Sequence, residues 1–284
     1  MTERGVTGGS VTDRGLAVVT GASSGIGASL ARLLAESGRD LFLVARRGGA
    51  LARLAEELSK ANGIDASFLA ADLGTPEGRE ALFASTEGAG RAVSILVNNA
   101  GFGLNGPEAE LPLERVLEML QLNVVATAEL THRFLVAMRA RHAGGILNVA
   151  STAAFLPIPY FAAYAASKAF ILSFTHALHE EAKKDGVTVT CLCPGYTKTN
   201  FHAVAGMRGA EATPFPEMTP EAVAKIGLEA LAKKKAYVVT HILDRAWIAS
   251  GRLMPRSVPV KLGAAVFSRT RLPEADSNEQ GQDH

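Results

Sequence analysis

Short runs of consecutive apolar residues alternate along the chain with longer segments in which apolar residues recur every three or four positions. The short runs predict buried strands, and the longer segments predict amphipathic helices. The expected strands lie at 16–20, 41–45, 66–71, 93–97, 145–150, 187–193 and 236–240. The expected helices lie at 24–37, 51–61, 76–87, 113–139, 160–184 and 220–233. Strands that alternate with helices in this way form a parallel sheet covered on both faces.

Seven such strands fit one domain. We therefore expect an α/β fold, a single-domain Rossmann-type doubly wound parallel sheet, over residues 15–245. A polar, flexible N-terminus at 1–14 should precede it, and a helical extension at 246–270 and a disordered tail at 271–284 should follow. The long stretch Tyr196–Thr219 falls outside the alternation and is expected to be a lid or binding loop.

Composition and charge narrow the class of protein. The chain has 284 residues, of which 48% are hydrophobic and 20% charged, which is typical of a soluble globular domain. A net charge of +1 offers no basic field for nucleic acid. There is neither a signal-peptide pattern nor an apolar run near the ~20 residues of a membrane span, so we expect a cytoplasmic protein.

Cysteine and histidine give no indication of a metal site. Cys191 and Cys193 lie one residue apart in an apolar run, and we expect both to be buried, free thiols. The histidines show no metal-ligand spacing. His176 and His179 are expected at the surface or in an interface.

A glycine-rich turn, Gly21-Ala22-Ser23-Ser24-Gly25-Ile26-Gly27, joins the first strand to the first helix. Glycines let the backbone approach a pyrophosphate, and the N–H groups of a helix N-terminus attract its charge. The spacing is G-x-x-x-G-x-G rather than G-x-G-x-x-G, but its place in the first strand–helix–strand unit predicts a dinucleotide site.

The end of the second strand indicates which dinucleotide binds. It ends at Arg46 and Arg47, and no acidic residue follows before Glu56. An acid at this place would hold a ribose hydroxyl, whereas arginine accommodates a 2′-phosphate. With Ser23 as a further donor, the sequence favours NADP(H) over NAD(H). The alternative is a pair of solvated arginines at a helix start.

Tyr164 and Lys168 are four residues apart in a predicted helix and therefore share a face. A nearby ammonium favours the phenolate and lowers the tyrosine pKa from its usual value of ~10. Such a pair is suited to acid–base chemistry. An isolated pair of this kind is more often a packed ring beside a solvated lysine, so its meaning depends on the rest of the chain.

Taken together, these motifs resemble the short-chain dehydrogenase/reductase (SDR) family over about residues 16–240. The resemblance rests on the ordered set Thr20 to Gly27, Asp72-Leu73, Asn98-Asn99-Ala100-Gly101, Asn123, Ser151, Tyr164 with Lys168, and Pro194-Gly195. It implies that Tyr164 is the general acid in carbonyl reduction and that Ser151 holds the substrate oxygen. It also implies that Lys168 lowers the pKa of Tyr164 and binds the nicotinamide ribose. Asn123 would position a water for a proton relay.

The resemblance also implies contacts along the cofactor. Asp72 would bind the adenine amine, although a turn or cap role is the alternative, and Asn98 would be structural. Thr197 would face the nicotinamide. With the residues argued above, the expected cofactor-binding set is Gly21, Ser23, Ser24, Gly25, Ile26, Gly27, Arg46, Arg47, Asp72, Leu73, Asn99, Ala100, Gly101, Tyr164, Lys168, Pro194, Gly195 and Thr197.

The substrate wall is expected to be largely apolar and aromatic, which suggests a lipophilic carbonyl or secondary alcohol. An ordinary core role is the alternative for each member. The expected substrate residues are Phe155, Tyr160, Tyr196, Phe201, His202 and Met207.

The leading functional hypothesis is an NADP(H)-dependent oxidoreductase that interconverts a carbonyl and a secondary alcohol. The alternative is a catalytically silent NADP(H)-binding sensor or interaction protein with the same fold. A third reading is ketone reduction on an acyl chain or acyl carrier, for which the only candidate basic docking face is 139–142.

The C-terminal segment indicates the oligomeric state. Residues 246–255 do not have the Gly-rich pattern that helps build one interface in many tetrameric relatives. We therefore expect a homodimer, through the helices at 113–139 and 160–184, rather than a tetramer. The apolar-basic stretch 258–271 should pack or contact a partner, and peripheral contact with a membrane surface is the alternative.

Overall fold

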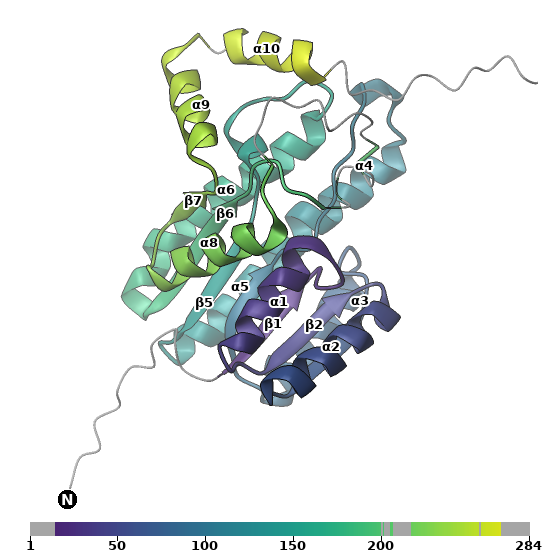
Figure 1. Ribbon diagram of the computed structural model, residues 1–284, viewed down its shortest axis with the longest axis vertical. Coiled ribbons are helices and arrows are strands. Elements are labelled where there is room, and N and C mark those ends of the chain that lie inside the picture. The colour runs from purple at the N-terminus through teal and green to yellow at the C-terminus, as the bar shows by residue number, and fades with distance from the viewer. Residues whose placement is uncertain (1–14, 200, 202–204, 207–216, 256, 268–284) are drawn as a thin grey trace, which may run out of the picture.

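The computed structural model describes residues 15–199, 201, 205–206, 217–255 and 257–267 (Figure 1). Its seven strands form one sheet in the order β3-β2-β1-β4-β5-β6-β7, and every neighbouring pair is parallel. The predicted doubly wound parallel sheet is therefore confirmed. The strands are β1 (Leu16–Thr20), β2 (Leu41–Ala45), β3 (Ala66–Ala70), β4 (Val93–Asn98), β5 (Gly144–Val149), β6 (Val187–Cys193) and β7 (Tyr237–Val239).

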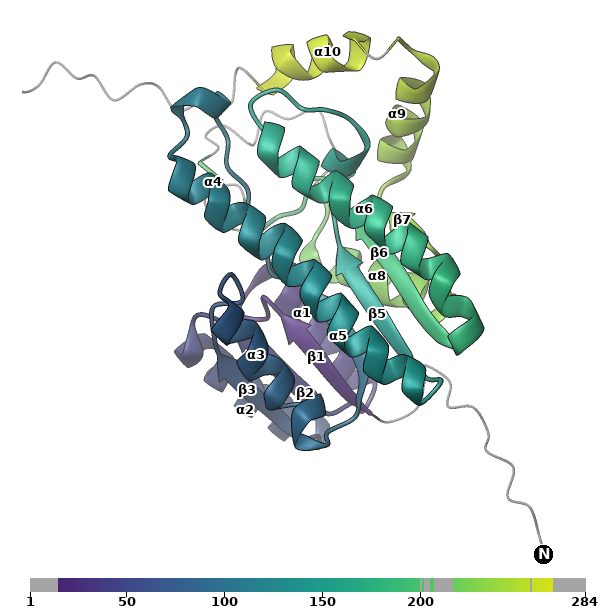
Figure 2. The same cartoon turned by 180° about the vertical axis from the view of Figure 1, so that it is seen from behind.

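Two helical layers cover the sheet because its central strands are apolar on both faces. In β1, Ala17 and Val19 belong to one buried cluster, while Leu16 and Val18 belong to the cluster on the opposite face. One layer consists of α1 (Gly25–Glu36), α2 (Gly48–Asn62) and α8 (Pro220–Ala232); the other consists of α3 (Pro76–Ala84), α5 (Thr127–Ala140) and α6 (Ala162–Ala182) (Figures 1 and 2).

The helix expected at 113–139 is not a regular α-helix throughout. The structure has α4 (Leu113–Leu120), then a π-helical segment η3 (Gln121–Ala126), then α5, and the three run on as one rod (Figure 2). A π-helical turn widens the helix locally and frequently lies at a functional site. Asn123 lies in this segment and is buried.

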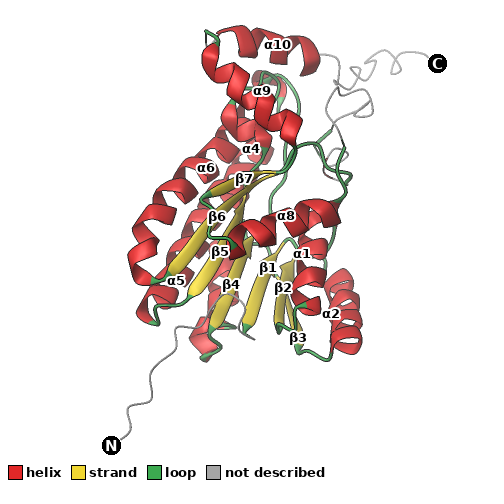
Figure 3. Ribbon diagram, turned by 60° about the vertical axis from the view of Figure 1, so that its left-hand side comes forward, coloured by secondary structure: helices red, strands yellow, loops and turns green. Residues whose placement is uncertain are grey.

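Two further helices, α9 (Ile242–Leu253) and α10 (Ser257–Phe267), lie at the end of the molecule where the strands have their carboxyl ends (Figure 3). The C-terminal extension is thus helical, but it begins at Ile242, inside the boundary that we expected at 245. The described residues also include 3-10 turns at η1 (Glu87–Ala89), η2 (Glu108–Glu110), η4 (Thr152–Phe155) and η5 (Lys183–Asp185). The expected flexible N-terminus and disordered tail lie outside the described residues.

Cys191 and Cys193 are buried and free, as predicted, with their sulfur atoms 3.7 Å apart. The surface or interface position expected for His179 is wrong. Its side chain is 5% exposed and its Nδ1 is hydrogen-bonded to the Val189 carbonyl at 2.8 Å, because this face of α6 packs on β6. His176 is exposed.

Two findings from the described part of the chain bear on metals and membranes. Three or more His, Cys, Asp or Glu side chains nowhere come together there in a group suited to a metal ion. Nor does any helix in these ranges have the length and apolar character needed to cross a membrane.

Candidate active site

The predicted catalytic residues Ser151 and Tyr164 come together at the carboxyl end of β5. Ser151 is the N-cap of η4, where its hydroxyl accepts a hydrogen bond from the Ala153 N–H at 3.1 Å. Tyr164 lies in the first turn of α6 and is 8% exposed. The Ser151 hydroxyl is also close enough to the Tyr164 phenol to lower its pKa. The two hydroxyl groups can therefore contact one substrate oxygen together.

The environment of Tyr164 is mainly aromatic. Its ring centroid lies 5.9 Å from that of Phe161 and 5.4 Å from that of Phe201. Burial raises the pKa of Tyr164 to about 12, and the Ser151 hydroxyl acts in the opposite direction. The phenol is therefore protonated at neutral pH. We expected Lys168 to lower this pKa, but desolvation raises it and the opposing effect comes from Ser151.

Lys168 is buried on the same face of α6. Its Nζ donates to the Val149 carbonyl at 3.0 Å and lies 5.8 Å from the centroid of the Tyr164 ring. Burial lowers the pKa of Lys168 to about 8. The ammonium is thus close to the phenol, but its described hydrogen bond goes to the strand and not to the tyrosine.

Asn123 connects α6, at Ser167 next to Lys168, to the loop that follows β4. Its Nδ2 donates to the Phe102 carbonyl at 2.9 Å and to Ser167 Oγ at 3.2 Å, and its Oδ1 accepts from the Phe102 N–H at 3.2 Å. A Cβ on Gly101 would lie 2.8 Å from Asn123 Oδ1 and 3.5 Å from Lys168 Nζ. Gly101, Asn123 and Lys168 therefore converge. The water relay through Asn123 stays a prediction.

The glycine turn is closely packed. Gly21 and Gly25 have φ values of +65° and +57°, which favour glycine. A Cβ on Gly27 would lie 2.3 Å from the Gly21 carbonyl oxygen, so the start of α1 meets the turn at a distance that no other residue permits. Ile26 packs against the core and anchors the turn. The turn thereby holds the N-terminus of α1 at the end of β1, the position at which dinucleotide-binding folds bind a pyrophosphate.

Thr20 and Asn99 fix this turn to β4. The Thr20 hydroxyl donates to the Val97 carbonyl at 3.1 Å and accepts from the N–H groups of Asn99 and Ala100 at 2.9 and 3.0 Å. The Asn99 side chain donates to the Thr20 carbonyl at 3.0 Å. These bonds join the carboxyl ends of β1 and β4, the two strands between which the strand order reverses. We assigned no role to Thr20 from the sequence, although its place at the end of β1 was a signal.

Asn98 has the structural role that we expected. Its Nδ2 donates to Asn148 Oδ1 at 2.9 Å, which ties β4 to β5, and to Thr131 Oγ1 at 3.0 Å, which ties β4 to α5.

The two arginines at the end of β2 have different partners. Arg47 Nη2 donates to Ser23 Oγ at 3.0 Å and to Ser24 Oγ at 2.9 Å. Arg46 Nη1 lies 4.0 Å from Asp72 Oδ2, and both side chains are largely exposed. Arg46 thus faces the Asp72 carboxylate, and Arg47 faces a pair of hydroxyls. Such a donor set suits a phosphate group.

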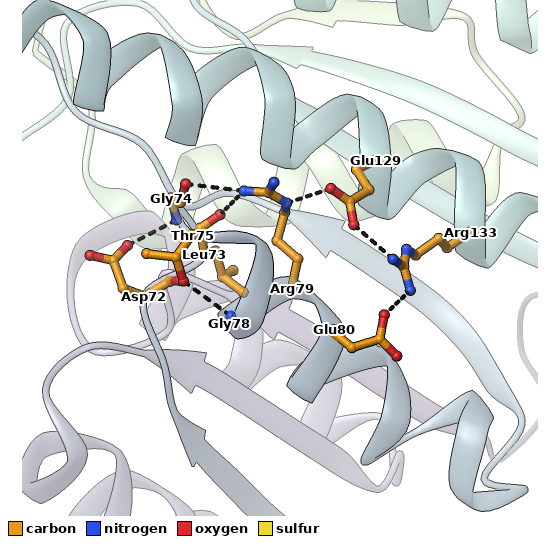
Figure 4. Close-up of polar contacts among 9 residues, drawn as sticks. All are labelled: Asp72, Leu73, Gly74, Thr75, Gly78, Arg79, Glu80, Glu129 and Arg133. Atoms are coloured by element: carbon orange, nitrogen blue, oxygen red, sulfur yellow. Dashed lines mark hydrogen bonds and ion pairs between the residues drawn. The ribbon is translucent and has the colours of Figure 1, made fainter.

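A residue that sequence reasoning missed holds the loop after β3 (Figure 4). Arg79, on α3, is 4% exposed, and its Nη1 donates to the carbonyls of Leu73 and Gly74, each at 3.1 Å. Its Nε donates to Glu129 on α5 at 2.6 Å. Asp72 Oδ1 accepts from the Gly74 N–H at 2.9 Å, which is the turn role left open for it, and its Oδ2 faces Arg46.

The segment after β6 returns toward the glycine turn. The Pro194 carbonyl accepts from the Thr152 N–H at 2.8 Å, beside Ser151. Thr197 is buried, and its hydroxyl donates to the Gly195 carbonyl at 3.0 Å. A Cβ on Gly25 would lie 3.1 Å from Thr199 Cγ2. The predicted nicotinamide residues therefore lie between the catalytic pair and the glycine turn.

The expected substrate residues are only partly brought together. Phe201 packs on Tyr164, whereas the Phe155 ring lies 6.1 Å from that of Tyr237, on the edge strand β7. The Tyr160 carbonyl accepts from the Gly106 N–H at 2.9 Å, and the Tyr196 carbonyl accepts from the Met218 N–H at 3.0 Å. His202 and Met207 lie outside the described residues.

A family model for the short chain dehydrogenases matches residues 15–208. The chain belongs to this family. The SDR enzymes are oxidoreductases, and the geometry described above fits that chemistry. The structure of a short-chain dehydrogenase from Sphingobium yanoikuyae in complex with NADPH is similar to this SDR chain, with a TM-score of 0.77 at 26% identity over 94% of this chain and 100% of that one.

Two curated relatives of this SDR chain reduce ketones on acyl chains, as their names state. The very-long-chain 3-oxoacyl-CoA reductase of Anas platyrhynchos is 31% identical over 253 residues, which cover 87% of this chain and 78% of the relative. The ketoacyl reductase HetN of a Nostoc species is 30% identical over 251 residues, 85% of each chain. A 7β-hydroxysteroid dehydrogenase structure has a TM-score of 0.80 at 25% identity over 88% of this chain and 96% of that one.

Proposed function

We propose that this SDR enzyme is an NADP(H)-dependent reductase of a lipophilic ketone, with Tyr164 as the proton donor. The observation that carries the proposal is the placement of the Ser151 hydroxyl next to the Tyr164 phenol, with the Lys168 ammonium 5.8 Å from the centroid of the ring. This pair lies at the carboxyl ends of the strands, on the same edge of the sheet as the glycine turn. That edge is where open α/β sheets bind ligands.

The residues of the chain supply orientation and the proton. A bound nicotinamide dinucleotide would supply the hydride. The Ser151 hydroxyl holds the carbonyl oxygen, and the Tyr164 phenol, protonated at neutral pH, donates its proton to the oxygen as negative charge develops there. The Lys168 ammonium, near the ring, stabilises the tyrosinate that results. A phenol whose pKa is about 12 is protonated at neutral pH and can therefore act as the proton donor in reduction.

The cofactor residues of this chain fit a phosphorylated dinucleotide. In the Gly21–Gly27 turn a Cβ would collide with the protein's own atoms, so the glycines allow the N-terminus of α1 to lie close against the turn. Arg46 and Arg47, together with the Ser23 hydroxyl, offer donors at the end of β2 for a 2′-phosphate. Asp72 and Leu73 lie on the loop fixed by Arg79, where they would contact the adenine. The likeness to an NADPH complex supports the same preference.

A 3-oxoacyl chain is the first substrate class that we propose, because two relatives carry that activity in their names. The aromatic surroundings of Tyr164 support an apolar substrate. The basic docking face considered at 139–142 does not support an acyl-carrier or acyl-CoA substrate. Arg139 is paired with Asp185, and Arg141 is paired with Glu87, so neither guanidinium is free.

Thermal unfolding with NADPH or NADH tests the cofactor part of the proposal. A ligand at about 100 times its Kd adds roughly 2.7 kcal/mol to the free energy of unfolding. We expect a larger shift with NADPH, and an Arg47→Ala variant should bind NADPH about 10- to 100-fold more weakly while its NADH affinity changes little. Arg53→Ala is the matched control, because Arg53 is an exposed arginine on α2, further along the chain than Arg47.

Reduction of 3-oxoacyl thioesters and bulky ketones, followed by NADPH absorbance, tests the catalytic part. In the unfolding experiment, an equal or larger shift of the unfolding temperature with NADH would overturn the NADP(H) preference. Tight binding of NADPH without turnover on any carbonyl or alcohol would instead support the alternative of a silent sensor.

We further propose that the enzyme is a cytoplasmic homodimer. Large apolar side chains are exposed on α4, α5 and α6, the helices expected to form the interface, and such clusters favour association. They include Leu113, Leu117, Val136 and Phe170, which are 70%, 51%, 55% and 37% exposed. Light scattering should give twice the monomer mass, and a monomer or a tetramer would overturn this part of the proposal.

A further inference from the structure

Helix α9 packs with a carboxylate inside and large apolar side chains outside. Asp244 is 4% exposed, whereas Ile242 and Leu243 are 72% and 60% exposed. One turn further, Trp247 is 40% exposed, and Ile248, four residues after Asp244, is buried. Hydrophobic burial alone would turn the large apolar residues inward and the carboxylate toward solvent. The burial of Asp244 therefore needs a reason other than packing.

The Asp244 carboxyl has an unsatisfied oxygen. Its Oδ2 is fully buried and, among the described residues, has no hydrogen-bond partner. The basic neighbours of Asp244 in the sequence make other hydrogen bonds. Arg245 donates from Nε and Nη2 to the Val239 carbonyl at 2.9 and 2.8 Å, and His241 accepts from the Leu243 N–H at 3.1 Å. A buried polar atom without a partner is costly, and burial accordingly raises the pKa of the Asp244 carboxyl.

This oxygen points at the candidate active site. A Cβ on Gly195 would lie 2.1 Å from Asp244 Oδ2, so the carboxylate occupies the space that a side chain at 195 would fill. Helix α9 also packs against η4, whose N-cap is Ser151. Asp244 thus approaches Gly195 from the side of β7, next to the place where cofactor and substrate should meet.

We propose that Asp244 is a specificity-determining residue whose carboxylate accepts a hydrogen bond from an N–H or O–H group of the ligand bound beside Gly195. This inference rests on the proposed function. Two ligands offer such a donor: the cofactor, through the carboxamide of its nicotinamide, and an acyl substrate, through an amide in its thioester arm. In either case a ligand without the donor leaves the buried oxygen unpaired, and sites of this kind reject such analogues strongly.

Two matched ligand pairs distinguish the sources. NADP⁺ is compared with its 3-acetylpyridine analogue, in which a methyl replaces the carboxamide nitrogen, by calorimetric Kd. A 3-oxoacyl N-acetylcysteamine thioester, which has an amide N–H, is compared with the S-ethyl thioester, which has none, by KM. We expect the wild-type enzyme to prefer the donor-bearing member of one pair by about 10- to 100-fold. The pair that shows the preference identifies the source.

The variants test whether Asp244 causes that preference. Asp244→Leu, of similar size, should abolish it, and Asp244→Asn, which keeps an acceptor oxygen, should retain part of it. Without ligand, neither variant should lower the unfolding temperature, because Asp244→Leu removes a buried polar group that lacks a partner and Asp244→Asn removes its buried charge. Asp65→Leu is the control, since its side chain is 72% exposed and lies at the opposite edge of the sheet.

The outcomes separate this inference from the proposed function. A wild-type enzyme that binds NADPH and turns over, but shows neither preference, overturns the role of Asp244 alone. The same holds if Asp244→Leu keeps the preference, or if it lowers the unfolding temperature and leaves both ratios intact. A wild-type protein that neither binds NADPH nor reduces either thioester overturns the proposed function and, with it, this inference.

Discussion

Tyr164→Phe should lower kcat for ketone reduction by about 10²- to 10⁴-fold while leaving the Kd for NADPH nearly unchanged. The substitution removes the hydroxyl that lies next to that of Ser151 and keeps the ring that packs between Phe161 and Phe201. The proton would then have to come from water, without the positioning that the pair provides. Steady-state kinetics and NADPH fluorescence titration on the same preparation measure both quantities.

The control for this prediction is Tyr237→Phe, the same change at a tyrosine that is 39% exposed and lies on the edge strand. It should keep full activity. If Tyr164→Phe also keeps wild-type kcat, the phenol is not the proton donor and the proposed mechanism fails.

The pH profile gives a second readout of the same pair. Tyr164, whose pKa burial raises to about 12, stays protonated through neutral and mildly alkaline pH. Lys168, whose pKa burial lowers to about 8, is charged below that pH and loses its charge above it. The kcat/KM for reduction should therefore be flat below about pH 7 and fall as Lys168 deprotonates. A rise through this range would mean that another group supplies the proton.

The sequence was most informative where the packing of the fold directly restricts which residues a segment can contain. Each central strand is buried on both faces, so a run such as 41–45 is apolar throughout and could be predicted as a strand from that fact. The glycine turn was predictable because Gly21, Gly25 and Gly27 are needed for close approach of the backbone. The pairing of Ser151 with Tyr164 was predictable only through the family resemblance, since no spacing rule alone places the end of a strand beside a helix.

The rest depends on how elements pack, which a periodic pattern does not encode. The pattern gave the helix at 113–139 but not its π-helical segment, because a widened turn leaves the apolar spacing nearly unchanged. Arg79 resembled an ordinary charged residue of α3, and only the tertiary fold places it on the carbonyls of the Leu73–Gly74 loop. Asp244 was missed for a stronger reason. The apolar residues around it predict that its side chain faces solvent, and the structure turns it inward.

The effect of burial on the catalytic pair also could not be inferred from spacing. The four-residue spacing in a helix correctly predicted that Lys168 lies near Tyr164. Spacing carries no information on the desolvation of either side chain. In the structure, burial raises the phenol pKa and lowers the ammonium pKa, so each group favours its neutral form. At neutral pH the phenol is therefore protonated and can donate its proton. Its raised pKa makes it a weaker acid than the phenol with a lowered pKa that we expected from the sequence.

Gly27→Ala should disable the cofactor site and destabilise the fold together. The added methyl would lie 2.3 Å from the Gly21 carbonyl oxygen and 2.5 Å from Asn99 Nδ2. The first of these is backbone at the end of β1, so relief requires α1 to move away from the turn. Overpacking of this kind costs about 1–3 kcal/mol of unfolding free energy. A displacement of the helix N-terminus by about 1 Å should lower kcat/KM by about 10²-fold.

Gly49→Ala separates this effect from a general response to removing glycine. Gly49 lies in the first turn of α2, and the nearest atom to an added Cβ belongs to the flexible guanidinium of Arg53, at 4.0 Å. Alanine there should be neutral or stabilising, because it has the higher helix propensity. Calorimetric unfolding and NADPH titration of both variants test the prediction. If Gly27→Ala bound NADPH as tightly as Gly49→Ala, the close approach of α1 to the turn would not be what forms the dinucleotide site.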